Sequence, residues 1–405
     1  MGLPRLLQYL SQEHADSMTV CSSVTQVDFV SGAYVLFDTD NVLRTMGYAN
    51  CRGLLQTLES HSNTCILAWD TSEGLRAAQK LKGKVGGNVL VVAPKSSGGK
   101  NADGIILAMM LRLATMEKSA TFVLVTTDTD LFCAGLGGPC PQSTAILACF
   151  KGHMDTLSFY SGSALAAKIV SRHDFILLSI LFLGADGLPG LLTKQGNDIA
   201  VTTNFHRAWE EVRHGGRPLV SRSASSGRYQ YRVDVGLLNR LITAMAPGEV
   251  TEQSTKKSAE DFLKAGVCQL HYYTTGTVMV GSMRYSHSQP PAAHAFRTAF
   301  ASSPFVMHEF DVSVPVVEVD GVGAIGWDVT GITLQKMEAQ PQRRTVLPAP
   351  SSTRQSYSFQ DRVVVSKVID SEKVSAAENA VLKACGLTSA IASDRGAKKR
   401  ARDSN

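Results

Sequence analysis

Two aspartates separated by one residue, Asp128 and Asp130, have the type and spacing that metal chemistry requires. They follow an apolar, β-branched run at 122–125, which is typical of a buried parallel strand. In an open α/β sheet, ligands bind at the carboxyl ends of the strands. Two carboxylates held close together repel each other unless a cation, a basic residue or water neutralises them. The pair therefore predicts a metal site, although aspartate is also a common turn residue.

Other aspartates strengthen this prediction because they also end apolar, strand-like runs. The runs 34–37, 65–69 and 175–183 lead to Asp38, Asp70 and Asp186, respectively. Asp103 opens a helix expected after a strand at 89–92, where an acid can also cap the helix and complement its dipole. Asp40 is expected to be only a turn residue beside Asn41. Several carboxylates at one sheet edge suit a divalent cation bound through oxygen.

The bulk composition is that of a globular protein. With 405 residues, 44% of them hydrophobic, the chain is long enough to bury a sizeable core, and two domains are expected. A formal net charge of +5 permits a polyanionic partner without requiring one. The eight cysteines occur singly, which predicts reduced thiols in an intracellular protein. The longest apolar run is too short to span a membrane and the N-terminus lacks a signal-peptide core, so we expect neither membrane insertion nor secretion.

Strand and helix patterns alternate over residues 1–215 and predict an α/β domain with a parallel sheet flanked by helices. Helices are expected at 3–14, 41–59, 75–84, 101–116 and, for the most part, 164–183. Strands are expected at 27–30, 34–38, 65–69, 89–92, 122–127, 146–148 and 156–160. These elements place the aspartates at strand ends or helix starts along one edge.

The remainder is predicted as a mixed α+β accessory region at 216–334, followed by a linker, short helix and flexible basic tail at 335–405. The Arg-rich stretch 215–232 resembles an exposed linker or flexible loop. Helices are expected near 236–246, 257–266 and 374–385, and strands at 276–280, 312–319 and 327–334. The basic run 398–402 suggests a nuclear signal or a nucleic-acid tail, with a cytoplasmic location left open. The region after 335 also has the composition of a segment that folds on a protein partner.

Six segments, in order, resemble motifs of the flap endonuclease and 5′-exoribonuclease superfamily, a branch of the PIN-like nucleases. They are MGLPRLLQYLSQEH, LFDTDN, ILAWD, VVAPKSSGGKNADGIILAMML, VTTDTDLFCAG and LFLGADGLPGLL, which together cover about residues 1–200. The resemblance is to compact viral members, which include flap-endonuclease-like proteins and host-shutoff ribonucleases. It implies a PIN-like fold for the first 215 residues.

The resemblance also implies hydrolysis of phosphodiesters assisted by two Mg²⁺ or Mn²⁺ ions about 3.5 to 4 Å apart. Asp38, Asp70 and Asp103 would hold the first ion, and Asp128, Asp130 and Asp186 the second, directly or through water. The implied contacts to nucleic acid are Gly2, Arg76, Lys80, Lys82, Lys84, Lys95, Lys100 and Lys194. A run of charge on a helix can equally be a solvated face. The isolated histidines His153, His173 and His206 are interpreted as structural or surface residues.

Departures from the family pattern leave three hypotheses open. The first is a 5′ nuclease acting on branched or 5′-ended nucleic acid, with DNA slightly preferred. The second is a ribonuclease that cuts single-stranded RNA, which the short insert after the second motif and the lack of a glycine-rich hairpin at 190–194 favour. The third is a catalytically silent nucleic-acid-binding scaffold, because Asn101 stands where the family has an acid.

Overall fold

The computed structural model describes a large part of the chain. The described residues are 5–21, 32–61, 64–69, 71–85, 89–94, 102–116, 119–126, 128–138, 144–149, 157–160, 162–185, 187–192, 198–225, 228–246, 248, 251–275, 278–279, 285–301, 305–307, 312–313, 316–319 and 323–326. The expected elements at 27–30, 327–334 and 374–385 and the tail from 335 lie outside these ranges. No helix within them is long and apolar enough to cross a membrane.

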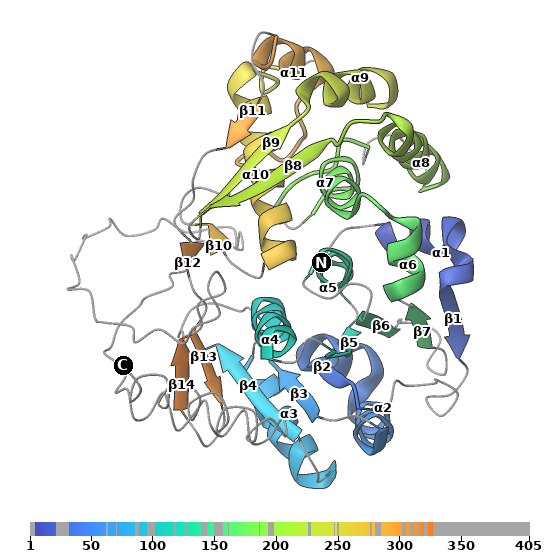
Figure 1. The fold of residues 1–405 in the computed structure, drawn as a ribbon, viewed down its shortest axis with the longest axis vertical. Helices are drawn as coiled ribbons and strands as arrows, with labels where there is room; N and C mark the ends of the chain where they lie inside the picture. Colours follow the sequence, from blue (N-terminus) through green and yellow to red (C-terminus); the bar gives the residue numbers. More distant parts are fainter. Residues whose placement is uncertain are drawn as a thin grey trace, which may run out of the picture.

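A nine-stranded sheet forms the lower part of the molecule (Figure 1) in the order β1-β7-β6-β5-β2-β3-β4-β13-β14. Its five central strands are parallel, namely β6 (Thr144–Cys149), β5 (Phe122–Thr126), β2 (Tyr34–Asp38), β3 (Thr64–Ala68) and β4 (Val89–Pro94). Antiparallel strands extend both edges, β7 (Leu157–Tyr160) and β1 (Met18–Cys21) on one side, β13 (Val316–Val319) and β14 (Gly323–Gly326) on the other. The predicted α/β class, a parallel sheet flanked by helices, is confirmed.

The central strands are buried on both faces, which explains their continuous apolar runs. Every residue of β2, β3 and β5 is buried. Tyr34 and Leu36 belong to the core shared with α4 (Ala102–Met116) and α5 (Thr129–Gly137). Val35 and Phe37 belong to the core shared with α2 (Thr39–His61) and α3 (Ser72–Val85). Successive side chains thus alternate between two helical layers, as the pleat of a strand requires.

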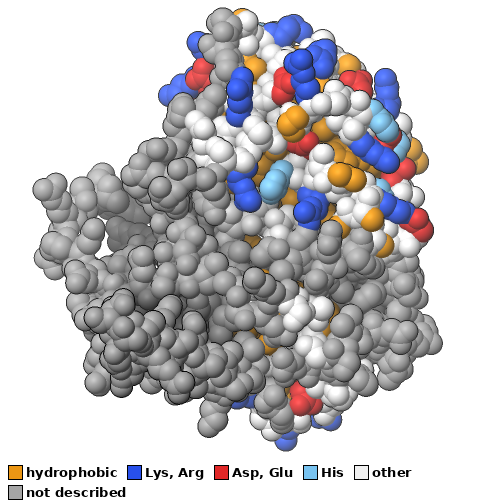
Figure 2. Space-filling model, viewed as in Figure 1, with side chains coloured by type: hydrophobic (Ala, Val, Ile, Leu, Met, Phe, Trp, Pro, Cys, Tyr) orange, Lys and Arg blue, Asp and Glu red, His pale blue; other side chains and the backbone are white. Residues whose placement is uncertain are grey.

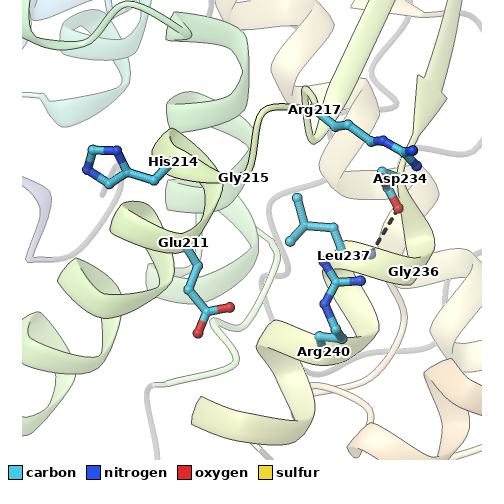
Figure 3. A pocket seen from close by; sticks show the side chains of 8 residues that line it. All are labelled: Glu211, His214, Gly215, Arg217, Asp234, Gly236, Leu237 and Arg240. Carbon is cyan, nitrogen blue, oxygen red and sulfur yellow. Dashed lines mark hydrogen bonds between the residues drawn. The ribbon is translucent and has the colours of Figure 1, made fainter.

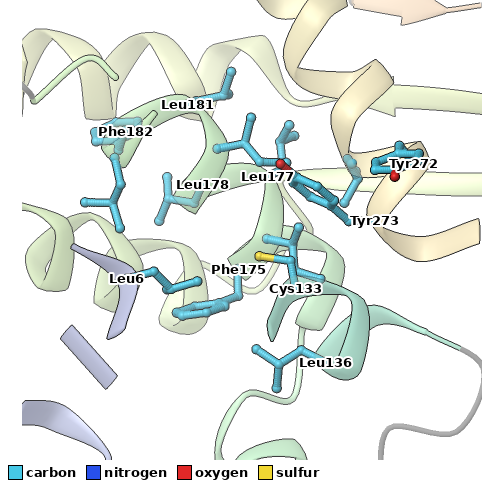
Figure 4. Packing of buried hydrophobic residues seen from close by; sticks show 14 of the residues in the cluster. Leu6, Cys133, Leu136, Phe175, Leu177, Leu178, Leu181, Phe182, Tyr272 and Tyr273 are labelled. Carbon is cyan, nitrogen blue, oxygen red and sulfur yellow. The ribbon is translucent and has the colours of Figure 1, made fainter. Parts of the chain in front are cut away.

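The apolar run at 175–183 forms a helix, so its interpretation as strand-like is wrong and the helix expected at 164–183 is confirmed. The segment contains α6 (Gly162–Lys168) and α7 (Arg172–Leu183), and every residue of α7 from Asp174 onward is buried. α7 packs against α5, α8 (Asp198–His214) and α10 (Lys256–Thr275). Figure 4 shows Phe175 of α7 and Cys133 and Leu136 of α5 within one cluster of buried side chains. A helix covered on all sides needs no polar face, which removes the amphipathic pattern.

The C-terminal part has the predicted mixed α+β character. A three-stranded antiparallel sheet joins β8 (Val220–Ser225), β9 (Arg228–Val233) and β11 (Phe305–Met307). The helices α9 (Val235–Met245), α10 and α11 (Ala293–Ala299) lie around it, and the short strands β10 (Val278–Met279) and β12 (Val312–Ser313) pair with each other. Near the N-terminus, α1 (Leu6–Glu13) and a short 3₁₀ helix (Ala15–Ser17) precede β1.

The expectation of a linker or flexible loop at 215–232 is wrong, because β8 and β9 form a hairpin there. Val220, Tyr231 and Val233 are buried, whereas Ser221, Ser223 and Arg232 are exposed. The hairpin buries only one face, and its exposed face carries serine and arginine. The polar residues of the exposed face outnumber the three buried apolar side chains, so the sequence pattern did not indicate a strand.

One hydrophobic cluster extends through both predicted domains. It includes Phe122 and Phe175 from the first 215 residues and Tyr231, Phe262 and Phe305 from the rest. α10 packs against α4, α5 and α7, and β13 pairs with β4. Segments distant in sequence therefore share a core, while the domain division at residue 216 stays a prediction.

Candidate active site at the carboxyl edge of the sheet

The parallel strands bring three of the predicted aspartates to one edge of the sheet. Asp38 is the last residue of β2, Asp128 lies two residues beyond the end of β5, and Asp103 lies in the first turn of the helix after β4. β5 and β2 are neighbours, with Phe37 aligned to Val125. Since neighbouring strands lie about 4.8 Å apart, β4 is about 10 Å from β2. This edge is the place where open α/β sheets bind ligands.

Thr126 connects the two adjacent strand ends. Its hydroxyl donates to Asp38 Oδ2 at 3.1 Å and accepts a hydrogen bond from the backbone N–H of Asp128 at 2.9 Å. Asn41 Nδ2 donates to the same Asp38 oxygen at 2.6 Å. Asp38 is 0% exposed, and a buried carboxylate is stable only with such partners. Thr126 therefore fixes the end of β2 relative to the start of α5.

Asp128 and Asp130 occupy the first positions of α5. Asp128 is the N-cap, and its Oδ1 accepts from the backbone N–H of Asp130 at 3.3 Å. Asp130 follows in the first turn and is buried. Both positions suit an acid, because the helix dipole is positive there. Burial raises the pKa of the Cys133 thiol well above its usual range, and the negative charges of Asp130 and Asp128 raise it further.

Asp40 has a role that the sequence did not reveal. It lies in the first turn of α2, where its carboxylate accepts hydrogen bonds from the side chain of Thr71 and, at 3.4 Å, from the backbone N–H of Thr71. Thr71 Oγ1 in turn accepts from the backbone N–H of Gly74 at 3.0 Å. A Cβ on Gly74 would lie 2.1 Å from Asp40 Oδ2. Asp40 therefore positions the start of α3 rather than serving as a simple turn residue.

The basic helix α3 presents its charges along its length rather than at one point. Arg76 lies near its start, whereas Lys82 and Lys84 are in its last turn. At 1.5 Å per residue, Lys84 lies about 12 Å along the helix from Arg76 and away from the carboxyl edge. Lys80 is exposed, and its Nζ lies 4.4 Å from the centre of the Tyr48 ring on α2. Arg76 is thus the member of this group nearest the acidic edge.

The loop after α7 is tightly built. Ala185 and Leu188 exchange backbone hydrogen bonds of 2.9 Å in both directions, and Leu191 N–H donates to the carbonyl of Leu181 at 2.9 Å. A Cβ on Gly190 would lie 2.4 Å from the carbonyl carbon of Leu183, so this position requires glycine. Gly190 thus has a structural explanation.

Several of the expected site residues lie outside the part of the chain that the structure describes. They are Gly2, Asp70, Lys95, Lys100, Asn101, Asp186 and Lys194. His153 also lies outside it. His206 packs on α1, with Nδ1 3.4 Å from the hydroxyl of Tyr9 and 3.6 Å from Glu13 Oε2. Burial lowers the pKa of His173 to about 4, with Arg222 and Arg172 acting in the same direction.

The described residues supply the donor chemistry for a hard cation but only part of a complete site. Asp38, Asp103, Asp128 and Asp130 offer the carboxylate oxygens that Mg²⁺ and Mn²⁺ prefer. Within the described ranges, however, no group of three or more acids, histidines or cysteines is arranged to hold a metal ion. Asp70 and Asp186, which follow β3 and α7 in the sequence, lie outside these ranges.

Comparisons with known proteins add little to this geometry. No protein-family model matches the sequence, and no curated protein matches it. Among solved structures, one described as the catalytic core of Rad2 (complex I) aligns with a TM-score of 0.37 and 10% identity, covering 74% of this chain and 99% of that chain. The catalytic core of Rad2 in complex with DNA substrate (complex II) has the same TM-score and identity, over 72% and 95% of the two chains. Similarity at this level assigns no family, so the interpretation rests on the site itself.

Proposed function

We propose that this protein is a divalent-metal-dependent nuclease that hydrolyses phosphodiesters in branched or 5′-ended nucleic acid. The observation that carries the proposal is the hydrogen-bonded link from Asp38 through Thr126 to Asp128 at the carboxyl edge of two parallel strands. Packing alone does not reward carboxylates gathered at one edge, because their charges repel each other. Their order along the chain also follows the motif order of flap-endonuclease-like proteins.

Each acidic residue has a distinct place in the proposed site. Asp38, Asp70 and Asp103 would bind one ion, and Asp128, Asp130 and Asp186 a second, some of them through water. Bound ions would supply the Lewis acidity that stabilises the attacking and leaving oxygens of the phosphodiester. Thr126 holds the Asp38 carboxylate in place, and Asp40 positions the start of α3, which carries Arg76. Arg76, with Lys80, Lys95 and Lys100, would contact phosphates, and Gly2, Lys82, Lys84 and Lys194 remain the outer candidates.

The test must separate the charge of Asp128 from its role as a helix cap. Asparagine caps a helix as well as aspartate does, whereas alanine does not and costs about 1 kcal/mol. Asp128→Asn should therefore abolish cleavage with little change in unfolding free energy, and Asp128→Ala should lose both activity and stability. Thr255→Ala is a matched control, because Thr255 Oγ1 accepts from the backbone N–H of Ser258 at 3.1 Å, far from the acids in sequence. It should lose stability and keep activity.

Cleavage would be measured on labelled 5′-flap DNA, nicked duplex, single-stranded DNA and single-stranded RNA, with Mg²⁺, with Mn²⁺ and with chelator. Metal-dependent cutting that disappears in Asp128→Asn supports the nuclease. Preferred cutting of single-stranded RNA would replace the 5′ nuclease by a ribonuclease. Binding without cutting under either metal would refute both and leave a nucleic-acid-binding scaffold.

A further inference from the structure

Positive charge is concentrated in a second region, which the nuclease proposal does not use. Residues 214–240 contain five arginines but one acid, Asp234. This segment comprises the end of α8, the β8–β9 hairpin and the first half of α9. Figure 2 shows basic side chains spread over the upper part of the molecule, where Figure 1 places these elements. A local excess of arginine is the electrostatic signature of a surface that binds a polyanion.

The exposed face of the hairpin is polar and carries one of these arginines. Ser221 pairs with Arg232, and Ser223 pairs with Gln230, so that all four residues share a face. All four are exposed. Hydroxyl, amide and guanidinium groups are the donors that contact phosphate oxygens in protein complexes with nucleic acids.

A cavity of about 630 Å³ lies beside this hairpin, between the end of α8 and the start of α9. Arg217 and His214 line it from the α8 side, and Arg240 and Leu237 from α9 (Figure 3). Arg217 follows α8 and lies four residues before Ser221, the partner of Arg232. Four residues of extended chain span at most about 14 Å, so one polynucleotide strand can reach both arginines.

The cavity is lined by two arginines, Arg217 and Arg240, and two acids, Glu211 and Asp234, and Figure 3 shows the Arg217 side chain directed towards Asp234. Asp234 caps α9, with its Oδ1 accepting from the backbone N–H of Leu237 at 2.9 Å. His214 Nε2 lies 3.1 Å from Glu210 Oε2, outside the cavity lining. Arg217, Arg232 and Arg240 form no hydrogen bond or ion pair with another residue in the described ranges. The carboxylate of Glu211, which also lines the cavity, would repel an incoming anion.

We propose that Arg217, Arg232 and Arg240 form a binding surface for the phosphate backbone of a nucleic acid, remote from the acidic edge. The surface deepens the proposed function, on which it rests, by holding the substrate away from the point of cleavage. α5 has nine residues and is thus about 14 Å long, and Gly137 at its end meets Ile176 of α7. Two residues before Ile176, Asp174 Oδ1 accepts a hydrogen bond of 2.8 Å from the backbone N–H of Val220, the first residue of β8. The hairpin thus starts at the end of α5 opposite to Asp128.

This separation sets a length requirement. A strand advances about 3.4 Å per nucleotide, so about four nucleotides are needed to span α5 alone. Oligonucleotides of four nucleotides or fewer should not engage both regions. Longer oligonucleotides of either DNA or RNA should engage both regions, because the proposed contacts are to phosphates, which both kinds of nucleic acid carry.

The test is equilibrium binding to the full chain in chelator, so that no cleavage occurs. Fluorescence anisotropy would compare labelled 24-mers of duplex DNA, single-stranded DNA and single-stranded RNA with a 4-mer. The triple variant R217Q/R232Q/R240Q should bind each 24-mer about tenfold or more weakly than wild type, and the loss should be smaller for the 4-mer, which offers fewer phosphates. The slope of log K against log salt should become shallower by about 2 to 3, since each lost phosphate contact removes about 0.7 to 0.9.

Two further variants make the result specific. Arg52→Gln removes an equivalent exposed charge from α2, in the other helical layer of the sheet, and should bind as wild type does. Glu211→Gln removes the opposing carboxylate and should tighten binding of the 24-mers. Circular dichroism would confirm that each variant is folded.

The outcomes separate this inference from the proposed function. Wild-type binding by the triple variant, or an equal loss in Arg52→Gln, would overturn the surface, even if Asp128→Asn had abolished cleavage. Weaker binding by the triple variant would support the surface, even if no variant cut any substrate and the nuclease proposal had failed. Loss confined to one type of nucleic acid would overturn the backbone contact, because phosphates are common to all three 24-mers.

Discussion

The carboxyl edge of the parallel sheet and the β8–β9–β11 sheet with its helices handle charge in opposite ways. At the carboxyl edge, the acidic residues Asp38 and Asp130 are buried. In the antiparallel region, the hydroxyl of Tyr231 and Nδ1 of His271 are buried 2.9 Å apart, while Arg217, Arg232 and Arg240 are exposed. Burial lowers the pKa of His271 to about 3, with Arg222 acting in the same direction, so the histidine is neutral.

The difference teaches which region depends on precise position. A buried carboxylate is stable only while specific donors stay in place, so the edge relies on Thr126 and Asn41. Exposed arginines act through their summed charge, which tolerates movement and is screened by salt. Structural damage at the edge should therefore cost more than loss of charge at the antiparallel surface.

Protonation of the buried His271 at low pH should have the largest effect on the free energy of unfolding. The folded-state pKa of His271 is depressed relative to its usual value of 6.5, so the unfolded chain binds the proton first as the pH falls. Stability from the neutral ring is complete above pH 6.5 and should decrease by about 1.4 kcal/mol per pH unit towards pH 3. Denaturant unfolding of wild type and His271→Asn at pH 7, 5.5 and 4.5 would measure this. A stability difference between the two proteins that does not change with pH would contradict the neutral buried histidine.

Removing the hydroxyl of Thr126 should destabilise the edge by about 2 kcal/mol. Thr126→Val takes a donor from the buried Asp38 carboxylate and an acceptor from the backbone N–H of Asp128. Thr126→Ser keeps both hydrogen bonds and should cost about 1 kcal/mol or less, through the lost methyl group. Chemical denaturation of both variants distinguishes hydrogen bonding from packing. A loss in Thr126→Ser with none in Thr126→Val would show that Thr126 acts through its methyl group rather than its hydroxyl.

A matched pair of glycines in first helical turns should respond differently in the two regions. A Cβ on Gly74 would lie 2.1 Å from Asp40 Oδ2, whereas on Gly236 it would lie 3.3 Å from Asp234 Oδ1. Gly74→Ala should cost about 1 to 2 kcal/mol, because the crowding outweighs the gain in helix propensity. Gly236→Ala should be within about 0.5 kcal/mol of neutral, since the propensity gain offsets a small displacement. Thermal melts suffice, and a reversed order would break the comparison.

Loss of one exposed arginine should have the smallest effect on stability. Arg232→Gln is expected to change the unfolding free energy by about 0.5 kcal/mol at most, because the side chain is exposed. Urea titration measures it against wild type. A loss of about 2 kcal/mol would mean that Arg232 supports the fold, which its proposed role in binding does not require.

Much of the parallel sheet could be predicted from sequence because its signals are local. The runs 34–37, 65–69 and 122–125 are continuous apolar stretches of strand length, which is the pattern of strands buried on both faces. Local patterns failed to predict two elements, a hairpin that buries only one face and a helix that is buried on all sides. The hairpin at 220–233 was hidden by its polar face, and α7 was ambiguous because no polar face remained.

The sequence by itself determined that Asp38 and Asp128 follow strands, because strand length and apolar character are properties of consecutive residues. Only the tertiary structure decided that β5 lies beside β2, that Thr126 contacts Asp38 across 88 positions, and that Asp40 contacts Thr71. These contacts depend on strand order and register, which arise from packing between segments distant in the chain. The same cause brought Arg217, which follows α8, and Arg240 of α9 to the lining of one cavity.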